Sequence, residues 1–314
     1  MQGEQLQHTT GYRVISDWLS AKGFQPFLFQ EEAWQHIINN KSGLVNAPTG
    51  CGKTFSVFLG SLIRFINEHP EDYRQRKNNG LLLLWISPLR ALAKDIGRAM
   101  EEVIAELGMQ WRVAIRNGDT ETAERTRQKK QPPEILLITP ESLHLLLAQK
   151  NYADFFSTLK LVAVDEWHEL LGSKRGVQVE LAISRLLHAV SAQPAVWGIS
   201  ATIGNLDEAR EVLLSPVAAL QGIDPSVAGE IVRAKLDKRT EVESILPDEI
   251  EKFPWAGHLG IKLAHKLVPI LLSSRTSLIF INTRGMSETW YQTLLTVCPE
   301  LAGSIALHHS SIDM

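Results

Sequence analysis

Short, mainly apolar runs alternate with longer segments of helical periodicity along most of the chain. Runs without an alternating polar face are typical of strands that are covered on both sides of a sheet. They occur at residues 43–47, 81–86, 111–116, 135–138, 161–164 and 195–199. The helical pattern occupies residues 55–66, 91–107, 121–130, 141–148 and 177–190. The alternation predicts an α/β fold built on a doubly wound parallel sheet.

Ligands of such sheets bind beyond the carboxyl ends of the strands, and the first strand is followed by a glycine-bearing segment, Ala47–Thr54. Gly50 and Gly52 let the backbone curl so that successive N–H groups point at one centre, where a helix N-terminus adds its positive dipole. Lys53 can reach the β- and γ-phosphates of a nucleotide, and the Thr54 hydroxyl can ligate Mg²⁺. The sequence predicts a nucleoside-triphosphate site, with contacts from Thr49, Gly50, Cys51, Gly52, Lys53 and Thr54.

Adjacent carboxylates end another predicted strand. Asp165 is placed to hold Mg²⁺ through water, and Glu166 to take a proton from an attacking water. Such base catalysis is typically worth about a hundred- to ten-thousand-fold in rate. His168 by itself would be a structural histidine. Ser200 and Thr202 follow a further strand, where their hydroxyls can hydrogen-bond the carboxylates or His168.

Residues 11–40 are expected to form two helical pieces that are interrupted at Gly23. Between them, Gln30 lies beside a small aromatic cluster. Its amide offers a donor and an acceptor side by side, which suits the edge of an adenine. The alternative is a solvated glutamine, and this stretch alone favours that alternative.

The pattern weakens after residue 215, where prolines recur and charges cluster. We expect a first domain at 1–215, a linker with extra strands at 216–256, and the first part of a second α/β unit at 257–314. One linker strand, at 230–236, could extend the first sheet. The second unit is predicted to contain helices at 261–272 and 286–296 and strands at 277–281 and 304–307. Roughly sixty residues are too few for a complete second sheet, so we expect the sequence to be a piece of a longer protein.

The amino-acid composition narrows the class of protein. Apolar residues make up 44% and charged residues 21%, with a formal charge of −3, which is ordinary for a soluble globular protein. No run is long and apolar enough to predict a membrane span, and the N-terminus lacks a secretory signal. Cys51 and Cys298 are too few for a disulfide framework or a cysteine metal site, so a cytoplasmic location is expected. The acidic balance counts mildly against nucleic acid as a partner.

Several motifs in one order nevertheless carry a family resemblance. They are Gln30, Ala47–Thr54, residues 88–92, 118–119, 139–143, 165–168, 200–202 and 280–284. Together they resemble the motifs of superfamily two helicases, whose domains are RecA-like. The tryptophan within Asp-Glu-Trp-His, the following residues 169–176 and Ser-Ala-Thr-Ile-Gly-Asn-Leu at 200–206 are similar to the Lhr (large helicase-related) group. Within it they resemble the bacterial ligase-associated DEXH-box helicases of DNA repair.

The resemblance implies an enzyme that hydrolyses ATP with Mg²⁺ and moves 3′-to-5′ along single-stranded DNA. The implied catalytic residues are Lys53, Asp165, Glu166 and His168; Thr54 and Asp165 are the implied metal ligands, and Ser200 and Thr202 the implied coupling residues. The implied nucleic-acid contacts are Pro88, Arg90, Gly118, Asp119, Thr139, Pro140, Thr283 and Arg284. Gln30 is implied to bind the adenine.

The family context also points to a DNA ligase or nuclease as a partner. The family's motifs V and VI, with their arginine fingers, would lie beyond Met314. An arginine finger is typically worth about a thousand- to a hundred-thousand-fold in turnover. Residues 1–314 alone are therefore expected to bind ATP poorly and to hydrolyse it very slowly.

Three alternatives stay open at the level of sequence. An RNA remodeller of the same architecture would use the same residues, because contacts to a strand's backbone carry little information and the 2′-hydroxyl decides between RNA and DNA. A P-loop kinase or small-molecule ATPase would need a closed acceptor pocket, and the second α/β unit argues against it. A non-catalytic scaffold would not need the residues at Lys53, Thr54, Asp165 and Glu166.

Overall fold

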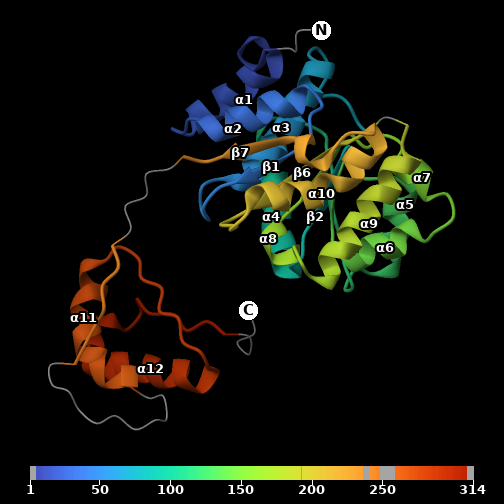
Figure 1. The fold of residues 1–314 in the computed structure, drawn as a ribbon. Helices are drawn as coiled ribbons and strands as arrows, with labels where there is room; N and C mark the ends of the chain where they lie inside the picture. The colour runs from blue at the N-terminus through green and yellow to red at the C-terminus, as the bar shows by residue number, and fades with distance from the viewer. Residues whose placement is uncertain (1–4, 192, 236–240, 248–258, 310–314) are drawn as a thin grey trace. The chain divides into compact units, whose positions relative to one another are not determined.

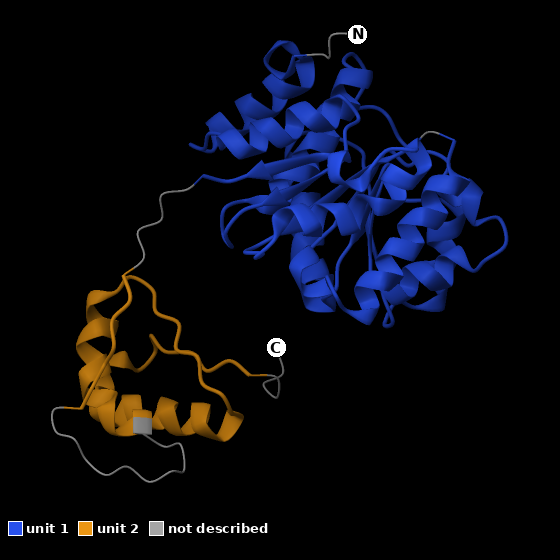
Figure 2. Ribbon diagram, in the orientation of Figure 1, with its two compact units in different colours: residues 1–236 blue, residues 237–314 orange. Residues whose placement is uncertain are grey.

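The computed structural model of the chain describes residues 5–191, 193–235, 241–247 and 259–309. The chain divides into two compact units, residues 1–236 and 237–314 (Figure 2). Each unit is described by itself below.

The first unit is built on a seven-stranded sheet with the order β3-β4-β2-β5-β6-β1-β7 (Figure 1). Every neighbouring pair is parallel. The strands are β1 (Gly43–Asn46), β2 (Leu83–Ile86), β3 (Val113–Arg116), β4 (Ile135–Ile138), β5 (Leu161–Val164), β6 (Ala195–Ser200) and β7 (Glu230–Arg233). The predicted doubly wound parallel α/β sheet is confirmed.

Helices cover both faces of the sheet, as the apolar strands require. One face is covered by α1 (Thr10–Ala21), α2 (Leu28–Ile38), α3 (Lys53–Glu68) and α4 (Arg90–Glu106). The other is covered by α6 (Pro140–Leu147), α7 (Tyr152–Phe155), α8 (Trp167–Leu170), α9 (Lys174–Ala189) and α10 (Leu206–Gln221). The charged helix α5 (Thr122–Lys130) follows β3, and the 3-10 turns η1 (Leu6–His8) and η2 (Pro225–Val227) complete the unit.

Successive residues of a strand pack into different cores because their side chains point to opposite faces. On β2, Trp85 belongs to the core under α1 to α4, whereas Leu84 belongs to the core under α6 to α10. The strand residues that carry these cores are almost completely buried. The carboxyl edge of the sheet is therefore held from both sides, which fixes the loops that follow the strands.

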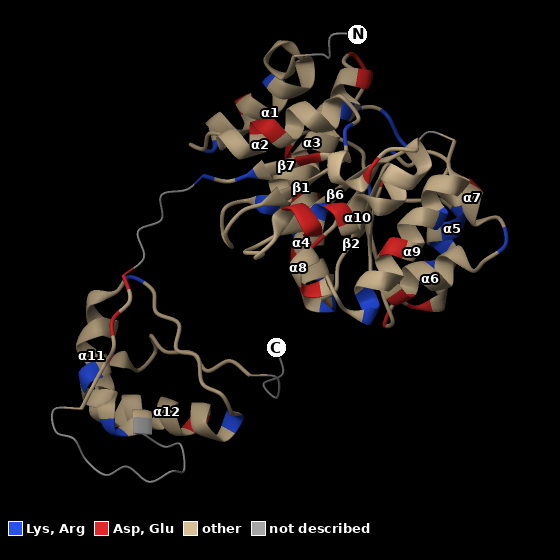
Figure 3. Cartoon of the chain, viewed as in Figure 1, with Lys and Arg blue, Asp and Glu red and all other residues tan. Residues whose placement is uncertain are grey.

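The linker strand predicted at 230–236 is found over Glu230–Arg233, and residue 236 lies outside the described residues. It pairs in parallel with β1, Gly43 opposite Glu230. The first unit therefore reaches residue 236, beyond the boundary expected at 215. The reason is α10, which continues through Pro216 to Gln221 and packs against the sheet before β7 begins. Acidic and basic residues are interspersed over the unit rather than separated onto different faces (Figure 3).

The second unit contains η3 (Leu259–Leu263), α11 (Ala264–Ser273), α12 (Arg284–Val297) and η4 (Pro299–Leu301). Both predicted helices are found, but residues 277–281 and 304–307 form no strand, and that part of the prediction is wrong. A strand needs a neighbour for its backbone groups. Leu278 is 79% exposed and Phe280 89%, so the described part of this unit offers them no sheet to join. Its assignment as a second RecA-like domain stays a prediction. No helix within the described residues has the length and apolar character to cross a lipid bilayer.

Candidate nucleotide and nucleic-acid site

The loop between β1 and α3 has the backbone geometry of a phosphate-binding loop. Gly50 (φ +84°) and Gly52 (φ +73°) both lie in the left-handed region that favours glycine. A Cβ at Gly52 would also approach the Gln30 Nε2 to 2.9 Å. Gly52 precedes the first residue of α3, so the loop ends at the positive end of a helix of four turns.

Lys53 is the first residue of α3, and its side chain is buried, with the residue only 8% exposed. Its Nζ has no hydrogen-bond partner among the described residues. A buried ammonium without a partner is costly, and a bound anion removes the cost. The Thr54 hydroxyl follows on the first turn of the same helix. Both residues therefore fit the phosphates of a nucleotide.

Asp165 directly follows β5, is 3% exposed, and receives two hydrogen bonds. The Glu166 backbone N–H donates to its Oδ1 over 2.9 Å, and the Trp85 indole Nε1–H donates to its Oδ2 over 3.3 Å. Burial, and after it the charge of Glu166, raises the pKa of the Asp165 carboxyl to about 6. These two hydrogen bonds and the charge of Lys53 act in the opposite direction. The hydrogen bonds thus hold the Asp165 carboxylate in one orientation, while its negative charge is balanced only in part.

Glu166 has φ +46°, a left-handed conformation that costs energy for a residue with a side chain. Its Oε2 lies 3.4 Å from the His168 Nε2. The His168 Nδ1 in turn accepts a hydrogen bond from the Ala201 backbone N–H over 3.3 Å, which fixes the ring tautomer. The strained turn and the histidine together fix where the Glu166 carboxylate points.

The predicted hydroxyl contacts to this histidine are not found. The Ser200 hydroxyl donates to the Ala201 carbonyl over 3.1 Å, while Thr202 is exposed. The connection from the loop after β6 to His168 is made by backbone, because Ser200 is completely buried and cannot reach it. Asn46, at the end of β1, donates a side-chain hydrogen bond to the same Ala201 carbonyl.

Gln30 is 5% exposed and lies against the phosphate loop, so it is not a solvated glutamine. Its Nε2 donates to the Gly52 carbonyl over 3.0 Å, and its Oε1 accepts from the Phe27 N–H over 2.9 Å. An amide retains one further N–H and one further lone pair after these bonds. Beside it opens a cavity of about 310 Å³, lined among others by Trp18, Phe24, Phe27, Gln30, Gly52 and Phe55.

The described residues contain no group of three or more His, Cys, Asp or Glu side chains that could hold a metal. Mg²⁺ is commonly held by one or two carboxylates together with substrate phosphates, and Asp165 and Thr54 carry oxygen atoms of the kind that it binds.

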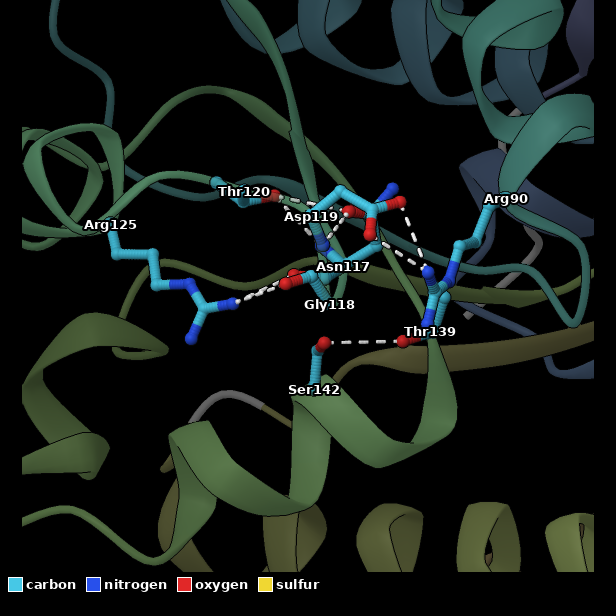
Figure 4. A network of polar contacts seen from close by, with 8 residues as sticks. All are labelled: Arg90, Asn117, Gly118, Asp119, Thr120, Arg125, Thr139 and Ser142. Atoms are coloured by element: carbon cyan, nitrogen blue, oxygen red, sulfur yellow. Dashed lines mark hydrogen bonds and ion pairs between the residues drawn. The ribbon is translucent and has the colours of Figure 1, made fainter.

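The carboxyl ends of β2, β3 and β4 carry a second polar group of residues (Figure 4). Arg90 begins α4, and its Nη1 lies 2.9 and 3.0 Å from the two carboxylate oxygens of Asp119. A Cβ at Gly118 would lie 2.9 Å from the Arg90 Nη2, so the guanidinium covers this glycine. Arg125 donates to the carbonyls of Asn117 and Gly118 over 3.0 and 3.2 Å.

Thr139 and Pro140 form the start of α6 beside this loop. The Thr139 hydroxyl donates to the Ser142 Oγ over 3.2 Å (Figure 4). Arg175 connects the same helix to the end of β2. Its Nη1 donates to the Pro88 carbonyl over 2.9 Å, and its Nε and Nη2 donate to the two oxygens of Glu141 over 2.7 and 3.2 Å. The sequence-predicted residues of the first unit thus meet at one edge of the sheet.

Comparison with known proteins decides the family. The sequence profile of the DEAD/DEAH box helicases matches residues 27–209, which span the whole of this edge. The chain belongs to the DEAD/DEAH box helicase family.

Among its relatives is the ATP-dependent helicase Lhr-Core of Methanothermobacter thermautotrophicus, 32% identical over 98% of this chain and 36% of that protein. The Lhr helicase/uracil glycosylase of Escherichia coli is 31% identical over 87% of this chain and 19% of that protein. The structure of Mycobacterium smegmatis helicase Lhr bound to ssDNA and AMP-PNP matches with a TM-score of 0.70 and 25% identity, over 97% of this chain and 38% of that one. The chain spans about a third of the length of its archaeal Lhr-Core relatives. The predicted resemblance to Lhr helicases is confirmed.

The second unit of this DEAD/DEAH box helicase carries the last two predicted strand contacts. Thr283 is the N-cap of α12, and its hydroxyl accepts from the Met286 N–H over 3.4 Å. Arg284 is the first residue of the helix. The first unit and this unit are separate bodies, so the role of both residues stays a prediction.

Two residues that touch the helicase site were not predicted from the sequence. Trp85 reads as a core residue, because nothing in an apolar strand distinguishes an indole N–H that faces a carboxylate. Arg175 lies on the first turn of α9, and its partners Pro88 and Glu141 are distant in sequence. Only the tertiary structure brings these residues to Asp165, Pro88 and Glu141.

Proposed function

We propose that this chain is the ATP-binding and strand-binding part of a DNA helicase that moves 3′-to-5′ along single-stranded DNA. The observation that carries the proposal is the buried Lys53 ammonium at the end of a glycine-bearing loop. It has no hydrogen-bond partner among the residues that the structure describes, and its charge acts on Asp165. The M. smegmatis relative bound to ssDNA and AMP-PNP supports both ligands.

The phosphates of ATP bind to the backbone N–H groups of the loop at Gly50 and Gly52 and to the Lys53 ammonium. The adenine enters the aromatic cavity beside Gln30, whose remaining N–H and lone pair can meet the base edge while the amide still holds Gly52 and Phe27. One side chain thereby contacts both the base and the phosphate loop.

Asp165 and the Thr54 hydroxyl are the residues that would hold Mg²⁺, directly or through water. When bound, Mg²⁺ supplies charge neutralisation on the β- and γ-phosphates. The pKa of Asp165, raised to about 6 by burial and Glu166, still leaves this carboxylate ionised at neutral pH. Trp85 and the Glu166 N–H hold its two oxygens in place.

Glu166 is the general base. It accepts a proton from the water that attacks the γ-phosphate, and its carboxylate is held near His168 at 3.4 Å. His168 also contacts the Ala201 N–H in the loop after β6. A change at Glu166 can therefore reach the loop that contains Ser200 and Thr202, which are the proposed coupling residues.

The single strand lies across the ends of β2, β3 and β4, where Pro88, Arg90, Gly118, Thr139 and Pro140 gather. Backbone phosphates and sugars are the groups that these residues suit, and such contacts carry no sequence information. A role in DNA repair, with a DNA ligase or nuclease as partner, belongs to the same proposal and rests on the family resemblance.

The proposal is tested by binding of a fluorescent ATP analogue with and without Mg²⁺, and by ATP hydrolysis with single-stranded DNA or RNA. Hydrolysis is measured on the longest available form of the protein, because residues 1–314 alone are expected to turn ATP over very slowly. We expect Mg²⁺-dependent nucleotide binding that Lys53→Ala abolishes, and stimulation by DNA in preference to RNA. Lys41→Ala is a matched control, because Lys41 pairs with Glu230 and precedes β1, at the opposite end of this strand from the phosphate loop. Stronger stimulation by RNA would indicate an RNA remodeller, and indifference to both strands would contradict the helicase proposal.

A further inference from the structure

The strand-binding edge already contains an anion of its own. Asp119 is an exposed carboxylate, 71% exposed in its side chain, and both of its oxygens lie within 3.0 Å of the Arg90 Nη1. A carboxylate repels a phosphate, so Asp119 is a poor ligand for a strand backbone. Asp119 instead pairs with Arg90, the side chain that would otherwise bind a phosphate.

The loop that carries Asp119 is held firmly in this arrangement. The Asp119 N–H donates to the Asn117 Oδ1 over 2.9 Å, and the Asn117 N–H donates to the Thr120 hydroxyl over 2.9 Å (Figure 4). Arg125 binds the carbonyls of this turn from the other side. Asp119 is thus presented to Arg90 by a built turn rather than by a loose surface side chain.

The same arginine also lies against Gly118. The Arg90 guanidinium lies where a side chain at this glycine would be, with its Nη2 2.9 Å from the Cβ position, although Gly118 itself is exposed. Because exposed pairs of this kind are weak, a phosphate can displace the carboxylate.

We propose that Asp119 is an internal competitor for the phosphodiester of a single strand at Arg90. Strand binding exchanges the Arg90–Asp119 pair for an Arg90–phosphate pair beside Gly118. Asp119 is then a positioning residue that holds Arg90 ready and weakens binding of the strand. The inference rests on the proposed function and specifies how its nucleic-acid edge is tuned.

The exchange has a consequence for salt dependence. A phosphate that pairs with a free arginine releases its condensed cation, and each such contact contributes about −0.7 to the slope of log K against log salt on single strands. The exposed Arg90–Asp119 pair that is broken is itself weakened by salt, so its loss offsets part of the salt dependence of the new contact. Removing the carboxylate should make the slope more negative by up to about 0.7.

The test is the affinity of the chain for a fluorescein-labelled oligothymidylate, measured by anisotropy over a series of KCl concentrations. Asp119→Asn keeps the shape of the side chain and the hydrogen bond that the backbone N–H at this position donates to Asn117. We expect it to bind the strand about two- to fivefold more tightly, the range that an exposed ion pair allows, and with the steeper slope. In an Arg90→Gln background the same change should have no such effect.

Glu121→Gln is the matched control. Glu121 is an exposed carboxylate in the same loop that makes no ion pair within the described residues. Equal tightening by Asp119→Asn and Glu121→Gln would overturn the proposal, because only net charge would then matter. Weaker binding by Asp119→Asn would overturn it as well, since Asp119 would then support the strand. A wild-type chain that binds no strand would contradict the proposed function itself, whereas normal binding without any effect of Asp119→Asn contradicts only this inference.

Discussion

Charged side chains are buried along one half of the carboxyl edge of the sheet and exposed along the other half. At the ends of β1, β5 and β6, Lys53 and Asp165 are buried, and the Lys53 ammonium has no hydrogen-bond partner within the described residues. At the ends of β2 and β3, Arg90 and Asp119 are exposed and paired with each other. A buried charge without a full set of partners is stabilised by ligand, so the first half is a preformed site. An exposed pair can exchange partners at little cost, which suits a strand that must be released at every step.

The largest effect is expected at the preformed half. Glu166→Gln removes the proposed general base but keeps the shape of the side chain, so single-turnover ATP hydrolysis by the longest available form of the protein should fall by about a hundred- to ten-thousand-fold. Nucleotide binding and strand binding should stay within a few fold of the wild type. Glu169→Gln is the control, because this neighbouring carboxylate is mostly exposed. An unchanged hydrolysis rate in Glu166→Gln would assign the base to another residue.

Asp165→Asn should raise the stability of the metal-free protein at neutral pH and abolish its Mg²⁺-dependent ATP binding. The folded protein holds a proton on Asp165 up to about pH 6, against 3.8 for an ordinary aspartate. The folded state therefore binds more protons than the unfolded chain between these values, and the stability of the metal-free protein falls as pH rises through this window. About two pKa units correspond to roughly 3 kcal/mol, an upper bound on what the amide should restore at neutral pH.

The measurement is thermal or urea unfolding of both proteins with a chelator present, from acid to neutral pH. The variant should lose the decline between about pH 4 and pH 6 and should also lose Mg²⁺-dependent ATP binding. A variant that is less stable than the wild type at neutral pH would show that the carboxylate is structural.

Much of this comparison was predictable from sequence, and the part that was not has a physical cause. Six strands of the sheet were predicted because each is a mainly apolar local run, whereas β7 was predicted only as a strand that could extend the sheet. The phosphate loop was predicted because Gly50, Gly52 and Lys53 act within a few residues. The strands expected at 277–281 and 304–307 depended on neighbours that the described part of the second unit does not supply. The pairs Trp85–Asp165, Arg90–Asp119 and Arg175–Glu141 join residues that lie 80, 29 and 34 positions apart. Their spacing carries no local signal.

Trp85 is a physical link between the two halves, because β2 ends at the strand-binding loop and its indole holds Asp165. Trp85→Phe removes one hydrogen bond to a charged group, of the order of 1.5 kcal/mol, so Mg²⁺-dependent nucleotide binding should weaken by about tenfold. Metal-free nucleotide binding should change little. Trp197→Phe is the control, because it removes an indole N–H that donates to the Lys41 carbonyl instead. Equal losses in both variants would point to core packing rather than to Asp165.

The smallest effect should come from the exposed half, where Arg175 fixes the groups around the strand. It binds both oxygens of Glu141 and the Pro88 carbonyl, a fork geometry that lysine cannot reproduce. Arg175→Lys keeps the charge, so long-range attraction of the strand is retained and only the positions of the loops change. We expect strand affinity to fall about two- to fivefold, with the salt slope and nucleotide affinity unchanged. Arg185→Lys on the same helix, where the guanidinium lies over the Tyr152 ring, controls for the substitution itself. If Arg175→Lys altered the salt slope instead, Arg175 would be a phosphate contact, and the exposed half would reach further along the edge than Arg90 and Asp119.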